Sequence, residues 1–376
     1  MKKRSYLFEN GKWDSSLDGS LNSPSTLVVC FGSSNTHPIE IALEDIYNNF
    51  QDSIIMGCST SGEIHNDLLY DQTLVVMVMQ FEKTSLKLHT QLISDSSDSF
   101  NIGRNLAKDL QNESLKAIFL LSDGLNINGS QLTKGIVETI NGVTVTGGLA
   151  GDGANFKSTW VLANTKPQSQ YITAVGFYGE DIHIAYGSQG GWKKFGIDRM
   201  VTQANANILY KLDNEPALEV YKKYLGDNAK DLPASGLLYP LMIKEKGYSE
   251  AKVRTILAID EQEQSITFAG DIPNGSEVMF MKATFNELVE GASQAAAQLE
   301  KFNYDNQEGA LIAISCVGRK LVLGSKTEDE LEAVMEYFSD NVEQIGYYSY
   351  GEISPLNDGR CDLHNQTMTL TLIWEE

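Results

Sequence analysis

A strand–helix–strand unit occurs three times in this chain, and this internal repeat constrains the fold more than any other feature. In each copy an apolar run is followed by a segment with helical spacing, a second apolar run and a glycine beside an acidic residue. Such self-similarity marks one supersecondary unit that is used several times. We therefore predict an α/β fold in which repeated strand–helix–strand units form mixed sheets and two pseudo-related halves. The runs that open the units are Val28 to Phe31, Ile118 to Leu121 and Leu311 to Ile314.

The acidic residues that end the three units have nearly the same spacing. The interval from Gly57 to Glu63 equals the interval from Gly346 to Glu352, and the middle unit, which ends at Asp152, is one residue shorter. If the two strands that flank each helix are parallel, both of their following loops open on the same edge of the sheet. Ligands of open α/β sheets bind beyond the carboxyl ends of the strands. The sequence therefore predicts that three similar loops meet at one edge and enclose a small molecule.

These loops contain the residues that we expect to bind the ligand. They combine glycines that permit close backbone approach, hydroxyl groups, carboxylates and an aromatic ring. An arginine after the first strand of unit three adds a planar guanidinium group that can bind a carboxylate with two nitrogens. The predicted ligand-binding residues are Cys58, Ser59, Thr60, Gly62, Glu63, Gly148, Gly151, Asp152, Arg319, Tyr350, Gly351 and Glu352.

The charged members of this set have a structural interpretation as well. A short acid after a glycine can accept hydrogen bonds from nearby backbone groups and hold its own loop. Arg319 can form a salt bridge with Glu352 or another of these acids instead of binding a ligand. If they do bind a ligand, Arg319 with Glu352 or Glu63 would supply the two opposite charges that an amino acid needs.

Cys58 and the histidines raise the question of catalysis and cofactors. The loop around Cys58 lacks a Gly-x-Ser-x-Gly elbow and a basic neighbour, so we predict a packed or ligand-facing thiol. The five histidines form no zinc or covalent haem motif, although haem needs only one axial ligand. His364 is the first candidate for such a ligand and His65 the second, and a hydrogen-bonded loop histidine is the alternative. We expect no enzymatic activity, with a hydrolase or transferase as the least favoured function.

The charge balance excludes several classes of partner. A net charge of −21 repels nucleic acids and anionic membranes. The basic start of the chain is not followed by an apolar segment, and no run approaches the roughly 18 apolar residues of a membrane span. The four cysteines are far apart and form no CxxC pattern. We expect a cytoplasmic protein with reduced thiols that binds neither nucleic acid nor membrane.

Several motifs in order resemble a known family. GCSTSGEI, GGLAGD, PALEVYKKYLG, SCVGRKLVLG, and YSYGEISP followed by LHNQTMT are similar to the two segments of the FIST sensory domain. The resemblance extends over roughly residues 25 to 376. It divides the chain into a lead-in over 1–24, an N-terminal domain over 25–215 and a C-terminal domain over 216–376.

The resemblance implies a function as well as a fold. FIST domains are regarded as intracellular sensors of small ligands, with amino acids among the candidates. Because the sequence shows no output domain, the signal would pass to a separate protein such as a histidine kinase or a cyclic-dinucleotide enzyme. Some members of the family resemble nitric-oxide sensors that carry haem, so a haem-based sensor on the same scaffold is the alternative function.

Overall fold

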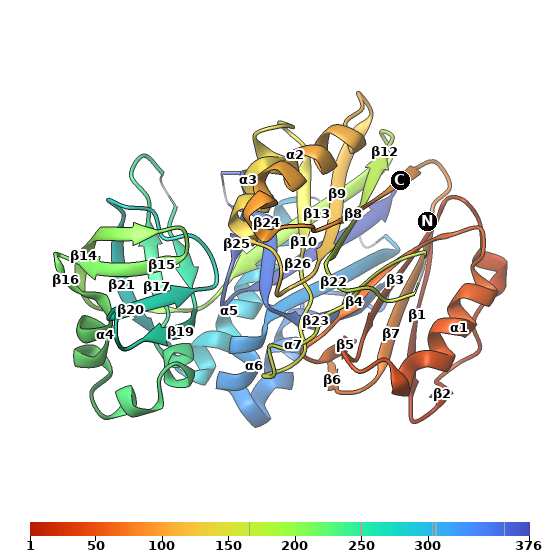
Figure 1. Ribbon diagram of the computed structural model, residues 1–376. Coiled ribbons are helices and arrows are strands. Elements are labelled where there is room, and N and C mark those ends of the chain that lie inside the picture. Colours follow the sequence, from red (N-terminus) through yellow and green to blue (C-terminus); the bar gives the residue numbers. More distant parts are fainter. Residues whose placement is uncertain (165, 249, 303, 305–306, 357) are drawn as a thin grey trace.

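Three six-stranded sheets and a smaller β-domain form the molecule (Figure 1). The structure is a computed structural model that describes residues 1–164, 166–248, 250–302, 304, 307–356 and 358–376. Each sheet is built around one of the predicted repeats, and each combines parallel and antiparallel pairs. The predicted α/β fold with repeated units and mixed sheets is confirmed.

The first sheet shows how the sequence of a unit produces its strands. The run Thr26 to Gly32 is buried along its whole length, which suits a central strand covered on both faces. It runs parallel to the strand that follows α1 (Glu40–Asn49), as a helical crossover requires. In spatial order this sheet consists of β11 (Val161–Ala163), β4 (Ile54–Ser59), β3 (Thr26–Gly32), β7 (Leu74–Gln80), β1 (Lys2–Glu9) and β2 (Lys12–Trp13).

The second and third sheets repeat this arrangement around the parallel pairs β9–β10 and β22–β23. The second sheet consists of β25 (Cys361–His364), β24 (Gly351–Pro355), β10 (Thr144–Leu149), β9 (Leu115–Ser122), β12 (Tyr171–Tyr178) and β8 (Ser85–Leu92). The third sheet consists of β13 (Ile182–Gln189), β26 (Met368–Glu375), β22 (Gly309–Cys316), β23 (Val342–Ser349), β5 (Glu63–His65) and β6 (Leu68–Tyr70).

The three units exchange strands in a cycle. Strand β5 of unit one pairs with β23 of unit three, β24 of unit three pairs with β10 of unit two, and β11 of unit two pairs with β4 of unit one. Strands β5 and β24 directly follow loops that the sequence singled out, and β11 follows the loop at Asp152 after a longer connection. The exchange therefore brings the three loops together at the same end of the sheets.

The sheets face one another across a shared core, and helices cover their outer faces. Phe31, Phe119 and Ile314 come from different sheets and belong to one buried cluster. The helix α1 covers the first sheet, α2 (Ser99–Leu110) and α3 (Gly129–Val137) cover the second, and α5 (Phe285–Ala297) and α7 (Thr327–Met335) cover the third. In the described part of the chain no helix is long and apolar enough to cross a membrane.

The smaller β-domain lies in the chain between β13 and α5, and it packs beside α3 and β25 (Figure 1). It has a core of its own, in which α4 (Ala217–Leu225) packs on the sheet. Its strands are β14 (Lys193–Asn205), β15 (Ile208–Leu212), β16 (Glu215–Pro216), β17 (Leu241–Lys244), β18 (Lys252–Arg254), β19 (Ile256–Asp260), β20 (Ser265–Phe268) and β21 (Glu277–Lys282). We call residues 193–282 the inserted domain.

Two boundaries expected from the family resemblance differ from the structural units. The segment 1–24 contains β1, which pairs with β7 along most of its length and completes the first sheet. The boundary between residues 215 and 216 falls within β16, inside the inserted domain. The sheets therefore follow the repeat, and the division at residue 215 stays a prediction from the family resemblance.

Short 3₁₀ helices connect several of these elements. They are η1 (Gly19–Leu21), η2 (His37–Ile39), η3 (Ser96–Asp98), η4 (Gly226–Asp231), η5 (Ala234–Leu238), η6 (Gln298–Phe302) and η7 (Gly324–Lys326).

Candidate functional site

The three predicted loops meet, and they contact one another directly. Their side chains are at most 8% exposed, because each loop packs against the next around the shared core. The backbone hydrogen bonds that join them are Ser61 N to Tyr348 O at 2.8 Å, Gly151 N to Ser59 O at 2.9 Å and Tyr350 N to Leu149 O at 3.3 Å. We call the segments 58–63, 149–152 and 348–352 the loop ring.

Two carboxylates of the loop ring, those of Glu63 and Glu352, accept hydrogen bonds from equivalent kinds of donor. Glu63 accepts hydrogen bonds from the hydroxyl of Thr60 and from both the backbone N–H and the hydroxyl of Thr73, at 3.0 and 2.8 Å. Burial raises the pKa of Glu63 to about 7, and burial likewise raises the pKa of Glu352 to about 7. The donors to Glu352 are Ser349 Oγ at 2.7 Å, Thr367 N at 3.2 Å and Thr367 Oγ1 at 2.9 Å.

Asp152 does not occupy the third equivalent position. Strand pairing places Glu63 opposite Tyr347 and Glu352 opposite Gly148. The equivalent pair of the first sheet is Val161 opposite Cys58, so a valine occupies the third position. The prediction of three equivalent acids is therefore correct for two units only, because unit two has a longer connection between β10 and β11. Asp152 instead begins that connection. Its carboxylate accepts hydrogen bonds from the backbone N–H groups of Phe156, Lys157 and Ser158, each at 2.8 Å. It also accepts a hydrogen bond from the hydroxyl group of Tyr350.

Arg319 is fully buried in α6 (Val317–Leu323) and has partners for each guanidinium nitrogen. Its Nη2 lies 2.6 Å from the carboxylate of Glu330 in α7, and both side chains are 0% exposed. Its remaining hydrogen bonds include one to the carbonyl of Gly190 at 2.6 Å and one to that of Leu288 at 2.8 Å. The ion-pair partner is Glu330 and not Glu352 or Glu63.

Cys58 points into the core, where it faces the Tyr347 hydroxyl group. Burial raises the pKa of the Cys58 thiol, which is the opposite of what a nucleophile requires. A Cβ atom on Gly148 would lie 2.7 Å from the same hydroxyl, so only glycine fits at this point of the core. Residues of three units thus pack together here.

The other small residues of the loop ring have structural contacts too. Ser59 Oγ accepts a hydrogen bond from the backbone N–H of Trp160 at 3.0 Å. Thr60 Oγ1 accepts a hydrogen bond from the backbone N–H of Gly62 at 3.1 Å. Gly62 has φ of 138°, a conformation that favours glycine. Gly351 pairs with Leu149 between β24 and β10.

His364 does not have a nitrogen free for haem iron. Its Nε2 lies 2.9 Å from the carbonyl oxygen of Ser354, its Nδ1 lies 3.3 Å from Ser188 Oγ, and the side chain is 8% exposed. It borders a cavity of about 200 Å³. His65, the second candidate, has its Nε2 3.2 Å from Ser5 Oγ. Among the described residues, no group of three or more His, Cys, Asp or Glu side chains is placed to hold a metal ion. The residues at His364 therefore do not fit a haem ligand set.

Two larger cavities lie where the inserted domain meets the second sheet. The larger has a volume of about 560 Å³ and extends between α3, the end of β14 and the residues that precede β25. The smaller has a volume of about 400 Å³ and is bordered by Tyr350 of the loop ring, by Asn128 before α3 and by Phe268 of the inserted domain. Both volumes fall in the range of small-ligand sites.

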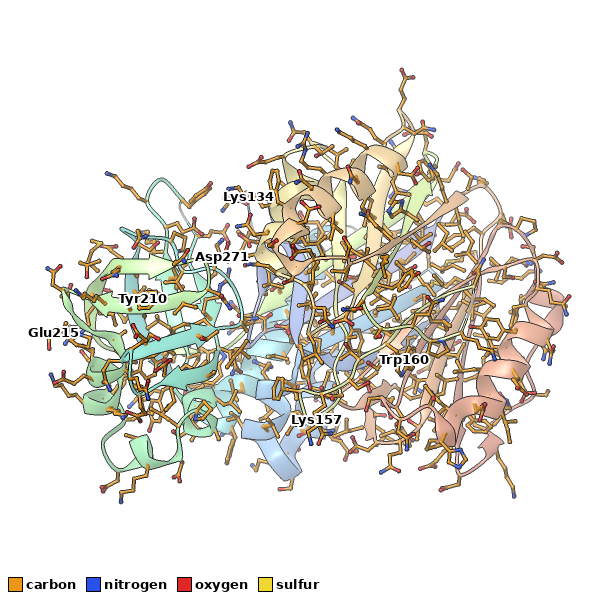
Figure 2. The ribbon with its side chains drawn as sticks, viewed as in Figure 1. Lys134, Lys157, Trp160, Tyr210, Glu215 and Asp271 are labelled. Atoms are coloured by element: carbon orange, nitrogen blue, oxygen red, sulfur yellow. The ribbon has the colours of Figure 1, made fainter. Side chains whose placement is uncertain are left out.

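A polar cluster separates the two cavities and attaches the inserted domain to α3. Asp271 accepts hydrogen bonds from the side-chain amides of Asn128 at 2.8 Å and Gln131 at 2.5 Å. Arg254, which is 1% exposed, donates to the carbonyl of Leu363 at 3.1 Å and to Ser130 Oγ at 3.4 Å. Figure 2 shows Asp271 at this boundary, close to Lys134 of α3. We call Asp271, Arg254, Asn128, Ser130 and Gln131 the clasp.

The larger cavity is lined by charges of both signs. Lys252 lies 2.6 Å from Glu245 and 2.5 Å from Asp362, so its charge is balanced within the wall. The guanidinium of Arg360 lies 3.8 Å from the centre of the Tyr248 ring. Its Nε and Nη2 atoms are shielded from solvent and have no hydrogen-bond partner among the described residues. Shielded guanidinium nitrogens without acceptors are an unusual and costly arrangement in a folded protein.

The sequence pointed to Tyr350 but missed the residues across the boundary. Arg254, Asp271 and Arg360 lie outside the repeated motifs, and no local pattern marks them as a group. The one signal in the sequence is the change from repeated units to a strand-rich segment after residue 236, and it does not identify these residues.

The comparisons with known proteins agree with the motifs. The FIST N domain matches residues 26–215 and the FIST C domain matches residues 217–355. An uncharacterised protein of Methanocaldococcus jannaschii is 27% identical over 188 residues, a match that covers 43% of this chain and 36% of that protein's length. FIST domains are small-ligand sensory domains of signalling proteins. The two matches together extend over most of the sequence, and the chain belongs to the FIST family.

Proposed function

We propose that this chain is a cytoplasmic sensory module that binds a small polar molecule, an amino acid or similar zwitterion, in the larger cavity. The observation that carries the proposal is the pair of Arg360 nitrogens for which the described part of the chain provides no acceptor, at the edge of a cavity between two domains. A ligand carboxylate would supply those acceptors in the bidentate geometry that guanidinium groups favour. Truncating one partner of such a shielded pair costs about 2 kcal/mol or more of binding free energy.

The opposite charge of a zwitterion also has a counterpart in this cavity. Asp271 and Glu245 border it from the inserted domain, and Glu138 borders it from the end of α3. An ammonium group near these carboxylates would be attracted by their charge, most strongly by those held away from solvent. The selectivity of the site would then depend on the distance between the two charges of the ligand.

A ligand in this cavity would contact both domains, which provides a route for a signal. The clasp forms one wall, so occupancy would change how Asp271 and Arg254 hold α3. A ligand shifts such an equilibrium only by its difference in affinity for the two arrangements. We propose that the shifted arrangement is recognised by a separate signalling protein, such as a histidine kinase or a cyclic-dinucleotide enzyme.

We propose a binding role without catalysis. Cys58, the one nucleophile that the sequence offered in the loop ring, is fully buried, and its thiol pKa is raised. A reactive thiolate needs a lowered pKa and access to substrate.

The test is a thermal-shift screen of free amino acids, followed by calorimetric titration of those that stabilise the protein. A ligand at 100 times its dissociation constant should stabilise the fold by about 2.7 kcal/mol. Arg360→Ala should weaken the selected amino acid by about 30-fold or more. The control is Arg104→Ala in α2, because Arg104 lies outside the residues that line either cavity. Equal affinity in both variants, or no stabilisation by any amino acid, would contradict the proposal.

A further inference from the structure

The smaller cavity has an aromatic wall made by Phe156 and Tyr350. Their rings are stacked, with centroids 4.5 Å apart and an angle of 14° between the planes. Tyr350 is 8% exposed and lies inside the stack, whereas Phe156 is 47% exposed and borders the open space. A large aromatic side chain is thus kept half exposed beside a cavity instead of being packed into one of the adjacent cores.

The backbone at Phe156 is held in an unfavourable conformation. Its φ of 52° lies in the left-handed region, which is a genuine outlier for a bulky side chain. Backbone strain of this kind persists only where the surroundings enforce it, and it clusters at ligand-binding segments. Here the strain determines the direction of one exposed aromatic ring.

The buried carboxylate of Asp152 enforces this conformation. It accepts the backbone N–H of Phe156 at 2.8 Å and the hydroxyl of Tyr350, which itself accepts the same N–H at 3.2 Å. Asp152 therefore fixes both rings of the stack at once. Asp152 and Phe156 both lie in the longer connection by which unit two departs from the repeat.

Apolar side chains from the inserted domain also line this cavity. Leu257 of β19 is 44% exposed, and Phe268 of β20 is buried. The polar residues Asn207 and Ser97 also border the cavity, and the amide nitrogen of Asn207 donates to the carbonyl of Phe268 at 2.8 Å. The cavity thus offers apolar surfaces on two sides and hydrogen-bonding groups at its border.

We propose that the smaller cavity is a second binding site that takes a flat aromatic or heteroaromatic ring system, stacked on Phe156 and covered by Leu257. Its volume of about 400 Å³ suits one or two fused rings with a short substituent. Offset stacking on an exposed aromatic face tolerates many ring systems, because each has a π-face. This site lies on the other side of the clasp from the polar site, so its occupant and the polar ligand would influence the same contacts.

The experiment uses indole and adenine as probes, with cyclohexanol as the nonaromatic control. Binding to the full chain is measured by saturation-transfer NMR and by calorimetric titration. We expect indole or adenine to bind and cyclohexanol to give no signal. Phe156→Leu should weaken the aromatic probe about 10-fold, whereas Phe156→Tyr, which keeps the ring, should preserve its affinity. Both variants retain a half-exposed side chain at residue 156, so the fold should be unaffected.

The matched control is Phe285→Leu, since Phe285 is also 47% exposed and does not border the cavity. This variant should bind the probes like the wild type. Arg360→Ala should also leave their affinity unchanged, which separates a failure of the polar site from a failure of this one. If neither probe binds at millimolar concentration, or if Phe156→Leu and Phe285→Leu bind equally, the aromatic site is refuted.

Discussion

The loop ring and the boundary of the inserted domain contain similar residue types, yet they differ in how completely those residues are satisfied. In the loop ring, Glu63 and Glu352 each receive three hydrogen bonds from side chains and backbone of their own surroundings. At the boundary, two Arg360 nitrogens have no acceptor among the residues that the structure describes, and Phe156 has a half-exposed ring on a strained backbone. Polar residues that converge therefore do not by themselves make a binding site. Groups without hydrogen-bond or packing partners are the better indication of where a ligand binds.

The same comparison separates the symmetric from the asymmetric parts of the molecule. Positions that repeat between units, such as Glu63 and Glu352, hold the exchanged strands β5 and β24 in place. Both candidate cavities lie where the repeat is broken, at the long connection after Asp152 and at the inserted domain. We expect substitutions in the first group to change stability and substitutions in the second group to change binding.

The largest effect should follow the loss of Arg319. Arg319→Ala leaves Glu330 buried without its ion-pair partner, and such losses cost about 3–5 kcal/mol of unfolding free energy. Urea unfolding followed by circular dichroism measures the change. Arg104→Ala removes a partly exposed arginine of α2 and should stay within about 0.5 kcal/mol of the wild type.

A double variant sharpens this first test. Arg319→Met combined with Glu330→Leu removes both charges, so it should be less destabilising than Arg319→Ala alone. Binding of any ligand found for the larger cavity should be retained in folded variants. A loss of affinity in the double variant without a loss of stability would mean that this ion pair belongs to the binding region after all.

The second effect is a dependence of stability on pH that originates in the loop ring. Burial raises the pKa of Glu63 and of Glu352 from 4.5 to about 7 in the folded protein. The folded state therefore binds more protons than the unfolded state between these values, and stability falls as the pH rises. The contribution is fully present below about pH 4.5 and is lost as the pH passes about 7, with a magnitude on the order of 3 kcal/mol for each group.

Urea unfolding at several pH values tests this effect. Glu63→Gln and Glu352→Gln should each flatten the decline between about pH 5 and about pH 8, and the double variant should flatten it most. The slope is informative even if the amide lowers stability at every pH. Glu44→Gln on the exposed face of α1 is the control and should keep the wild-type slope. An unchanged slope in the double variant would show that these carboxylates are charged in the folded state throughout.

The sequence predicted the repeated architecture because its signals are local and recur. The units are identified by buried runs such as Thr26 to Gly32 and by the helical spacing that follows them. The loops meet because the two strands of each unit are parallel and therefore end at the same edge of the sheet. The cyclic exchange of strands could not be predicted, because nothing within β5 or β24 specifies a partner in another sheet. The same limit applied to the site, since Asp271 contacts Asn128 from a distant part of the chain. Arg319 pairs with Glu330 only because α6 and α7 pack together, which no motif around either residue specifies.

The smallest change in stability, and the most informative change in dynamics, should come from the clasp. Asp271→Ala removes the acceptor for the amides of Asn128 and Gln131, which should cost about 1 kcal/mol because both amides are partly exposed. The helix α3 keeps its own cap, since Asn128 Oδ1 still accepts the N–H of Gln131. Hydrogen exchange should accelerate in the first turn of α3 and at the inserted-domain segment beside it. In the control Asp260→Ala, which breaks the hairpin turn at Gln262 in the same domain, exchange should rise in that hairpin alone. If α3 exchanges at the same rate in both variants, the clasp does not hold the two regions together, and the two cavities must act independently.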